Sequence, residues 1–245
     1  MTEPSEAGIR RWGAIPRSAH EQFGPEGDFC RQHLLNPVLW RMLGDVSGRR
    51  VLDAGSGQGY LCRLLAARGA KVVGLEPGRS LLDYAMDLEV ADPLGIEYVE
   101  ADLSAPPALG TFDVVVANVV LSAIPDWRAA MRACVSALDV GGVFVFSINH
   151  PCFEQLWTTW REHGVYRTDR YLQEYEIPAT YAADFHRPLS AYLNELAGLG
   201  CRIREIAEPG LDPAVADEAA PGVEAYIELP NFLVVCAERA ELPGE

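Results

Sequence analysis

A buried strand that leads into three closely spaced glycines limits the folds open to this chain. The segment Val51-Leu52-Asp53-Ala54-Gly55-Ser56-Gly57-Gln58-Gly59 passes from an apolar run into the glycines, and a helical pattern follows it. Glycines permit a sharp turn and close backbone approach to a ligand, and the start of the next helix presents free N–H groups. The segment therefore predicts a loop that binds a nucleotide-like cofactor. A tight strand-to-helix turn without a ligand is the alternative.

Apolar runs rich in Val and Ile alternate with longer amphipathic segments from Arg50 onward. We expect strands at residues 50–54, 71–75, 96–100, 113–117, 142–148, 201–207 and 231–237, and helices at residues 58–68, 79–90, 126–138 and 188–199. This alternation predicts a Rossmann-like α/β fold, a mostly parallel seven-stranded sheet with helices on both faces. No long helix separates the two late strands, so we expect the last strand to be antiparallel.

The spacing after the glycine loop helps to decide between cofactors. In dinucleotide-binding loops the third glycine stands three places after the second, whereas Gly59 follows Gly57 by two. The next expected strand ends at Glu76, whose carboxylate can accept hydrogen bonds from both hydroxyls of a ribose. A solvated acid at a strand end is the other explanation for Glu76.

These motifs resemble the class I S-adenosylmethionine (SAM)-dependent methyltransferases over residues 48–150. The resemblance implies SAM as cofactor and S-adenosylhomocysteine (SAH) as product. It implies that the glycine loop holds the methionine end of SAM and that Glu76 binds the ribose. It also implies that Pro77 packs on the adenine and that Asp102 binds the adenine amino group. The implied cofactor-binding residues are Asp53, Gly55, Ser56, Gly57, Gly59, Glu76, Pro77, Asp102, Leu103 and Asn118. Asp102 and Asn118 are also explained as turn-forming or helix-capping residues.

Two short motifs narrow the resemblance within this family. Asn-His-Pro-Cys-Phe at residues 149–153 and Phe-His-Arg-Pro-Leu at residues 185–189 look like bacterial small-molecule methyltransferases of the ubiquinone and menaquinone group, many of which tailor natural products in secondary metabolism. Many relatives have a histidine near position 123, where this chain has Ala123, so a relative's mechanism does not transfer directly. The chain also lacks the Asn-Pro-Pro-Tyr and Asp-Pro-Pro-Tyr motifs, which disfavours adenine-N6 and glutamine targets.

We expect one domain of four parts. Residues 1–47 form an N-terminal arm and helix, 48–150 the SAM-binding core, 151–190 a cap insertion and 191–245 a closing helix and strands. Residues 1–26 lack a sustained period, and a helix is expected from residue 28 to residue 43. Residues 1–28 and 151–190 are expected to close over the sheet as a lid.

The cap insertion is rich in aromatic residues and follows a strand, where ligands of α/β sheets bind. Its expected substrate-binding residues are Phe153, Trp157, Tyr171, Tyr181 and Phe185. Such density suits a flat or cyclic organic substrate. A satellite hydrophobic cluster or a dimer contact is the alternative.

Three residues of this region are candidates for catalysis. Methyl transfer from a sulfonium is an in-line displacement, and a base is needed only when the nucleophile must lose a proton. His150 and His186 are the candidate bases and Tyr175 a third catalytic candidate, with Tyr171 and Glu174 behind them. Each histidine is equally well explained as a hydrogen-bonded structural residue. The histidines show no ligand spacing with one another or with cysteine, so no metal site is expected. A magnesium-dependent catechol-type site built from Asp and Asn is the alternative.

Composition bears on partners and location. The formal net charge of −15, from 35 acidic and 20 basic residues, disfavours nucleic acid and anionic membranes. The polar N-terminus and the lack of a long apolar run predict neither a signal peptide nor a membrane span. Six scattered cysteines without a C-x-x-C pair indicate reduced thiols in the cytoplasm. We therefore expect a small-molecule acceptor, no nucleic acid or membrane partner, and a monomer or homodimer.

Three other functions compete with methyl transfer to a small molecule. A nucleotide-dependent oxidoreductase would use the same fold, but the spacing of Gly57 and Gly59 argues against it. A SAM- or metabolite-binding protein without catalysis keeps the glycine loop and needs no base. A methyltransferase of a protein substrate also stays open.

Overall fold

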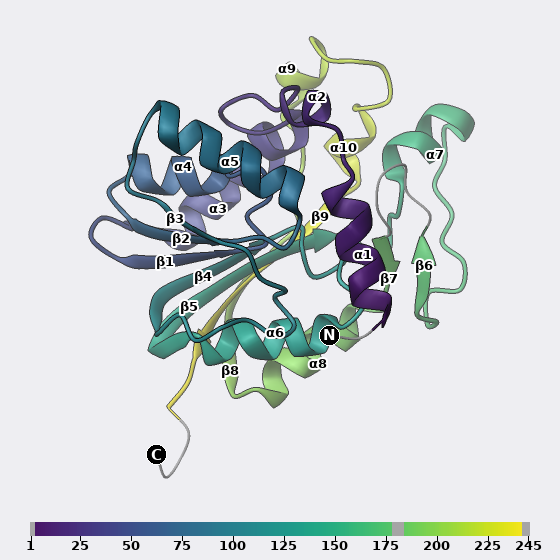
Figure 1. The fold of residues 1–245 in the computed structure, drawn as a ribbon. Helices are drawn as coiled ribbons and strands as arrows, with labels where there is room; N and C mark the ends of the chain where they lie inside the picture. The colour runs from purple at the N-terminus through teal and green to yellow at the C-terminus, as the bar shows by residue number, and fades with distance from the viewer. Residues whose placement is uncertain (1–2, 178–183, 242–245) are drawn as a thin grey trace.

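The computed structural model describes residues 3–177 and 184–241 and is built on a seven-stranded sheet (Figure 1). The strand order is β3-β2-β1-β4-β5-β9-β8. The strands are β1 Arg50–Ala54, β2 Lys71–Leu75, β3 Glu97–Val99, β4 Phe112–Asn118, β5 Leu138–Asn149, β8 Cys201–Ala207 and β9 Phe232–Arg239. Strands β1 to β5 pair in parallel, and β9 pairs antiparallel with both β5 and β8. The expected Rossmann-like sheet with an antiparallel last strand is confirmed.

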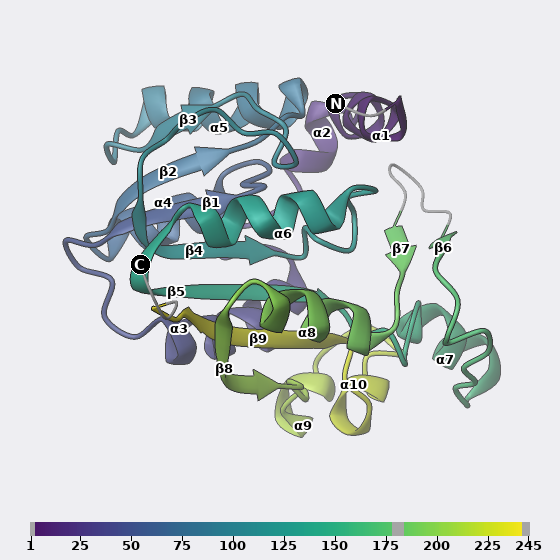
Figure 2. The ribbon, with the colours of Figure 1, turned by 90° about the horizontal axis from the view of Figure 1, so that it is seen from below.

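Alternate side chains of the strands point to opposite faces, which gives the sheet two cores. Val51 packs in a cluster with Leu39 and Leu61, whereas its neighbour Leu52 packs in a cluster with Trp127 and Leu196. The helices near the sheet are α3 Asn36–Leu43, α4 Tyr60–Ala67, α5 Arg79–Ala91, α6 Trp127–Ser136 and α8 Leu189–Gly198. Helices α3 and α4 therefore cover one face and α6 and α8 the other (Figure 2).

Helix α3 is shorter than the helix expected over residues 28–43. Residues Arg31–Leu35 form a π-helical turn, and the α-helix starts only at Asn36. Pro37, in the first turn of α3, has no N–H, so the regular hydrogen-bond ladder is interrupted there. Strand β5 is longer than expected because it begins at Leu138, which pairs with Phe112 of β4.

The arm and the cap contain elements that the sequence pattern did not predict. These are α1 Glu3–Gly13, α2 Arg17–His20, α7 Leu156–His163, and the antiparallel pair of β6 Tyr175–Ile177 and β7 Asp184–His186; α9 Pro213–Ala216 and α10 Ala225–Glu228 lie between β8 and β9. The arm is fixed to α5 by hydrogen bonds. Ser80 Oγ donates to the carbonyl of Ile15 over 2.7 Å and lies 3.1 Å from His20 Nε2.

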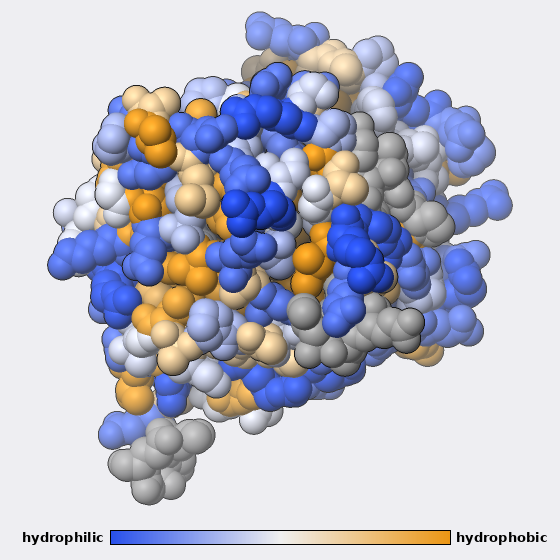
Figure 3. Space-filling view, viewed as in Figure 1, coloured by the Kyte–Doolittle hydropathy of each residue, from blue (hydrophilic) through white to orange (hydrophobic). Residues whose placement is uncertain are grey.

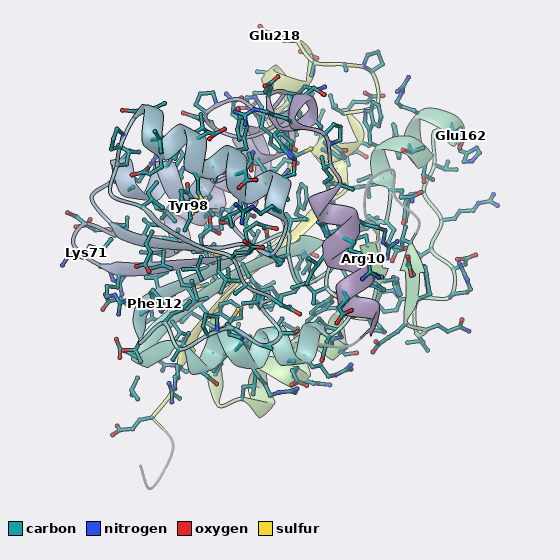
Figure 4. All side chains as sticks on the ribbon, in the orientation of Figure 1. Arg10, Lys71, Tyr98, Phe112, Glu162 and Glu218 are labelled. Atoms are coloured by element: carbon teal, nitrogen blue, oxygen red, sulfur yellow. The ribbon has the colours of Figure 1, made fainter. Side chains whose placement is uncertain are left out.

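The arm and the cap lie beyond the carboxyl ends of the parallel strands. Lys71 and Phe112 begin β2 and β4, whereas Arg10 of α1 and Glu162 of α7 lie at the opposite end of the sheet (Figure 4). This end is where ligands of open α/β sheets bind.

The surface drawn in Figure 3 mixes hydrophilic residues with small apolar patches. The most exposed large apolar side chains are those of Leu172 and Val90, which lie on separate segments. Within the described residues, no helix combines the length and the apolar character needed to cross a membrane.

Candidate cofactor and acceptor site

The loop between β1 and α4 is held in a conformation that favours glycine. Gly55, Gly57 and Gly59 have φ angles of 85°, 56° and 85°. A Cβ on Gly55 would lie 2.7 Å from Val120, and one on Gly59 would lie 2.4 Å from the Tyr98 hydroxyl. These two glycines are therefore needed for packing.

Gly57 differs from its two neighbours because it borders open space. A Cβ built at Gly57 would meet no atom within 4 Å. Gly57 also lines a cavity of about 520 Å³ above the carboxyl ends of the strands. This glycine thus leaves room for a ligand rather than for a neighbouring side chain.

Glu76 follows β2 and faces the glycine loop across this cavity. The amide of Gly57 donates to Glu76 Oε2 over 3.0 Å, and the amide of Gly78 donates to Oε1 over 2.7 Å. The residue is only 6% exposed. Burial raises the pKa of the Glu76 carboxyl to about 7, although the two amides oppose the rise. Each oxygen keeps a lone pair for a further donor.

Asp53 and Asn118 lie deeper, at the ends of β1 and β4. Cys62 Sγ donates to Asp53 over 3.2 Å, and burial raises the pKa of the Asp53 carboxyl to about 6. Asn118 accepts from Ser147 Oγ over 2.6 Å and donates to the Tyr60 hydroxyl over 2.5 Å. The residue after Asn118, Val119, has a φ of 59°, which is strained for a β-branched side chain.

A second cavity, of about 390 Å³, adjoins the first. Asn149 and Asp184 line both cavities, and Asn149 Nδ2 donates to Asp184 Oδ2. The second cavity is also lined by aromatic side chains of the cap and its surroundings, namely Phe153, Trp157, Phe185, Tyr192 and Tyr226.

Glu154 joins two of the candidate catalytic residues. His186 Nδ1 and the Tyr175 hydroxyl both bond to the Glu154 carboxylate, the hydroxyl over 2.9 Å, and the Tyr175 and His186 rings stack. His186 Nε2 donates to the carbonyl of Tyr171 over 2.8 Å. Burial, together with the bond to Glu154, raises the pKa of Tyr175 to about 12. Both ring nitrogens of His186 are therefore engaged.

His150 is also fully hydrogen-bonded. Its Nδ1 accepts from the amide of Cys152 over 3.2 Å, and its Nε2 lies 2.8 Å from Glu208. This pattern requires the tautomer with the proton on Nε2. His150 is not among the residues that line the two cavities, so the geometry gives it a structural role and leaves its role as a base an unsupported prediction.

The comparisons with known proteins point in one direction. A family model described as "Methyltransferase domain" matches residues 52–146. The ubiquinone biosynthesis O-methyltransferase of Stutzerimonas stutzeri is 31% identical over 152 residues, which are 60% of this chain and 64% of that protein. The chain thus spans just under two thirds of the length of this curated relative.

Solved structures extend the similarity to the sheet and its flanking elements. An S-adenosylmethionine-dependent methyltransferase from Mesorhizobium loti superimposes with a TM-score of 0.74 and 28% identity, covering 88% of this chain and 100% of that one. A putative S-adenosylmethionine-dependent methyltransferase from Listeria monocytogenes, at 24% identity, has a TM-score of 0.71 with 84% and 96% coverage and supports the fold. Residues 52–146 therefore form a methyltransferase domain, and the chain has the fold of the SAM-dependent methyltransferases.

Half of the cofactor residues expected from the sequence line the larger cavity: Gly55, Gly57, Glu76, Pro77 and Asn118. The others do not line it: Asp53, Ser56 and Gly59 belong to β1 and the glycine loop, and Asp102 and Leu103 follow β3. Of the expected substrate residues, Phe153, Trp157 and Phe185 line the second cavity. Tyr171 does not, but its hydroxyl accepts from the Leu189 amide over 3.1 Å. Tyr181 lies outside the described residues.

Sequence reasoning missed several residues of the methyltransferase site. The arm contributes Trp12, Ile15, His20 and Phe23 to the larger cavity, and Gln58, Ser122, Asn149 and Asp184 also line it. Gln58 lies in the glycine loop and Asn149 in the Asn-His-Pro-Cys-Phe motif, but neither motif marks these two residues as lining a cofactor cavity. The other positions lie in no motif, because they meet only through the folding of distant segments.

The residues present fit SAM. Gly57 leaves space that a Cβ would fill. Two buried polar atoms, Gln58 Nε2 in the loop and Asp102 Oδ2 after β3, have no hydrogen-bond partner within the described residues. Buried groups of this kind are costly unless a ligand or water satisfies them. Glu76 and Pro77 follow β2, beside the loop that follows β1.

Proposed function

We propose that this methyltransferase transfers the methyl group of SAM to a small aromatic or heterocyclic metabolite. The observation that carries the proposal is the pair of adjoining cavities, one bordered by Gly57 and Glu76, the other by aromatic side chains of the cap. The cavities share Asn149 and Asp184, so ligands in the two would meet at these residues.

The chain's own residues would bind and align the reactants. The glycine loop would hold the methionine part of the cofactor, Glu76 the ribose, and Pro77 with Asp102 and Leu103 the adenine. When bound, SAM supplies a methyl group on a positively charged sulfur. Side chains of the arm, including Trp12 and Phe23, line the same cavity and would exclude water from it.

The volume of the second cavity suits a small acceptor. Its volume of about 390 Å³ is at the small end of the range of ligand sites, which run from about 300 to 1,000 Å³. Rings of Phe153, Trp157 and Phe185 offer stacking surfaces. We therefore propose that the acceptor is a molecule of one or two rings, such as a quinone precursor or a natural product that the enzyme tailors. We also propose that the enzyme is cytoplasmic and acts as a monomer or as a homodimer.

An assay of methyl transfer tests this proposal. The protein is incubated with SAM carrying a labelled methyl group and a panel of small aromatic metabolites, and labelled products are measured. We expect a labelled product with the wild-type protein and with Glu97→Ala, a change at an exposed glutamate of β3, and a loss of at least about tenfold with Glu76→Ala. SAH binding without any labelled product would favour a SAM-binding protein without catalysis or one with a protein substrate.

A further inference from the structure

The order of the strands shows which residues lie at each end of the larger cavity. Glu76 follows β2, the glycine loop follows β1, Asn118 ends β4 and Asn149 ends β5, and these strands are neighbours in that order. A cofactor whose ribose lies at Glu76 and whose amino-acid part lies at the glycine loop therefore directs its reactive centre toward β4 and β5. Asn149 and Asp184 are at this end.

Asp184 lies where the two cavities meet, which we call the junction, and donors from two elements hold it there. Asn149, the last residue of β5, donates its side-chain amide to Asp184 Oδ2, and the amide of Phe185 donates to Oδ1 over 3.0 Å. Within the described residues Asp184 makes no ion pair, because the nearby Arg187 guanidinium donates to the carbonyls of Leu121 and Ile124. Each carboxylate oxygen retains a lone pair that a ligand can use.

A second polar group lies at the same end. Ser122 is 3% exposed and lines the larger cavity. Its hydroxyl is a hydrogen-bond donor to the Asp184 carboxyl and helps to orient it. The hydroxyl oxygen keeps lone pairs that a polar atom of a ligand can use. Asp184 and Ser122 belong to segments joined directly, since the Phe185 amide donates to the carbonyl of Ser122 over 2.8 Å.

The two candidate histidines, His150 and His186, are poorly placed to accept a proton from a ligand in these cavities. Both ring nitrogens of His150 and of His186 are bonded to protein groups, and His150 does not line the shared junction. Asp184 is the ionisable side chain common to both cavities. Burial raises the pKa of the Asp184 carboxyl, which makes it a better proton acceptor than an exposed aspartate.

We propose that Asp184 accepts the proton of a hydroxyl or amine on the acceptor, and that the enzyme is therefore specific for O–H or N–H nucleophiles. This inference rests on the proposed methyl transfer. The acceptor oxygen or nitrogen forms a bond to the methyl carbon, the bond from that carbon to sulfur breaks with its electron pair staying on sulfur, and the acceptor proton moves to Asp184. The positive charge of the sulfonium and the negative charge of the carboxylate are both neutralised.

Asp184 also sets which acceptors are excluded. A carboxylate acceptor would place a second negative charge beside that of Asp184 in a buried site, which is unfavourable. An O–H or N–H group instead donates a hydrogen bond to the carboxylate before transfer. The ring of the acceptor would lie against the aromatic side chains of the second cavity.

The test compares matched probes and matched variants. Formation of SAH from SAM is measured with catechol, naphthol and aniline, and with benzoate and naphthoate, for wild type, Asp184→Asn and Asp169→Asn. Asp169 is an exposed aspartate of the cap whose side chain is 87% exposed. Calorimetric titration with SAH reports separately on folding and cofactor binding.

We expect wild type and Asp169→Asn to turn over the hydroxyl or amine compounds and not the carboxylates. Asp184→Asn should lose about 10²- to 10⁴-fold in kcat/KM while it binds SAH within about threefold of wild type. Turnover by Asp184→Asn within about threefold of wild type overturns the inference, as does wild-type turnover of carboxylates alone or of none of the hydroxyl and amine compounds. Failure of wild type to bind SAH would instead contradict the proposed function.

Discussion

The carboxyl group of Glu76 is oriented for a ligand by the two backbone amides that hold it. Both amides belong to loops that follow parallel strands, so the fold itself sets the direction of the carboxylate. The cost is a buried acid whose pKa is raised to about 7. Ribose hydroxyls donate to the ionised form, so binding and ionisation of Glu76 should be coupled.

Affinity for SAH should therefore depend on pH through Glu76. Because the protonated form prevails below pH 7, binding there must release a proton, and affinity should fall by up to about tenfold from pH 8 to pH 6. Calorimetry at both pH values, in buffers of different ionisation enthalpy, measures the affinity and the proton release. Glu76→Gln lacks the titrating group and should show a weaker binding but little change with pH. An equal pH effect in both proteins would contradict this role.

At the scale of residues, the sequence predicts a site residue only when that residue belongs to a local motif. Gly57 and Glu76 were found because a glycine loop and the end of the next strand are close in sequence. Asp184 and Asn149 were not, because their contact joins positions 35 residues apart and depends on how the cap folds back. His150 and His186 were candidate bases with a structural role as the equal alternative, because their hydrogen-bond partners could not be inferred from the sequence.

At the scale of elements, Arg187 connects the cap to the loop after β4. Its guanidinium is 3% exposed and donates to the carbonyls of Leu121, Ile124 and Pro125. The same loop contributes Ser122 to the larger cavity. Buried carbonyl groups lose their partners if this side chain is shortened or made apolar.

Replacement of Arg187 should destabilise the protein. Arg187→Met leaves three carbonyls without a donor, so we expect the free energy of unfolding to fall by about 2–4 kcal/mol. Arg167→Met, at an exposed arginine of the cap, is the matched control and should change stability by less than about 0.5 kcal/mol. Denaturant unfolding measures the stability of both variants. An Arg187→Met protein as stable as wild type would show that the hydrogen bonds of Arg187 to the three carbonyls contribute nothing to stability.

The strands were predicted more successfully than the arm and cap. Buried parallel strands are continuous apolar runs, and β1, β2 and β8 have the bounds expected from the sequence. Helix α1 contains Gly8 and Gly13, and β6 and β7 have three residues each, so neither gives a sustained period. Their positions are set by contacts such as that of Ser80 with Ile15.

At the scale of the whole molecule, the sheet order explains why the site lies where it does. The chain crosses from β3 to β4, which pairs with β1, so the loops after β1 and β4 lie next to each other. The arm, which precedes β1, and the cap, which follows β5, both lie at this end of the sheet (Figure 1). The central claim is that this opening binds SAM, and Gly57 offers a direct way to test it.

Titration calorimetry with SAH on Gly57→Ala and Gly164→Ala is that test. Both glycines have a positive φ, 56° and 63°, and a Cβ on either meets no atom within 4 Å, so each variant should lose about 1–2 kcal/mol of stability. Gly57 lines the cavity, whereas Gly164 ends α7 and does not line it. We predict that wild type and Gly164→Ala bind SAH equally and that Gly57→Ala binds at least about tenfold more weakly, or about 1.4 kcal/mol. Equal affinity in all three proteins, or no binding by wild type, would contradict the account.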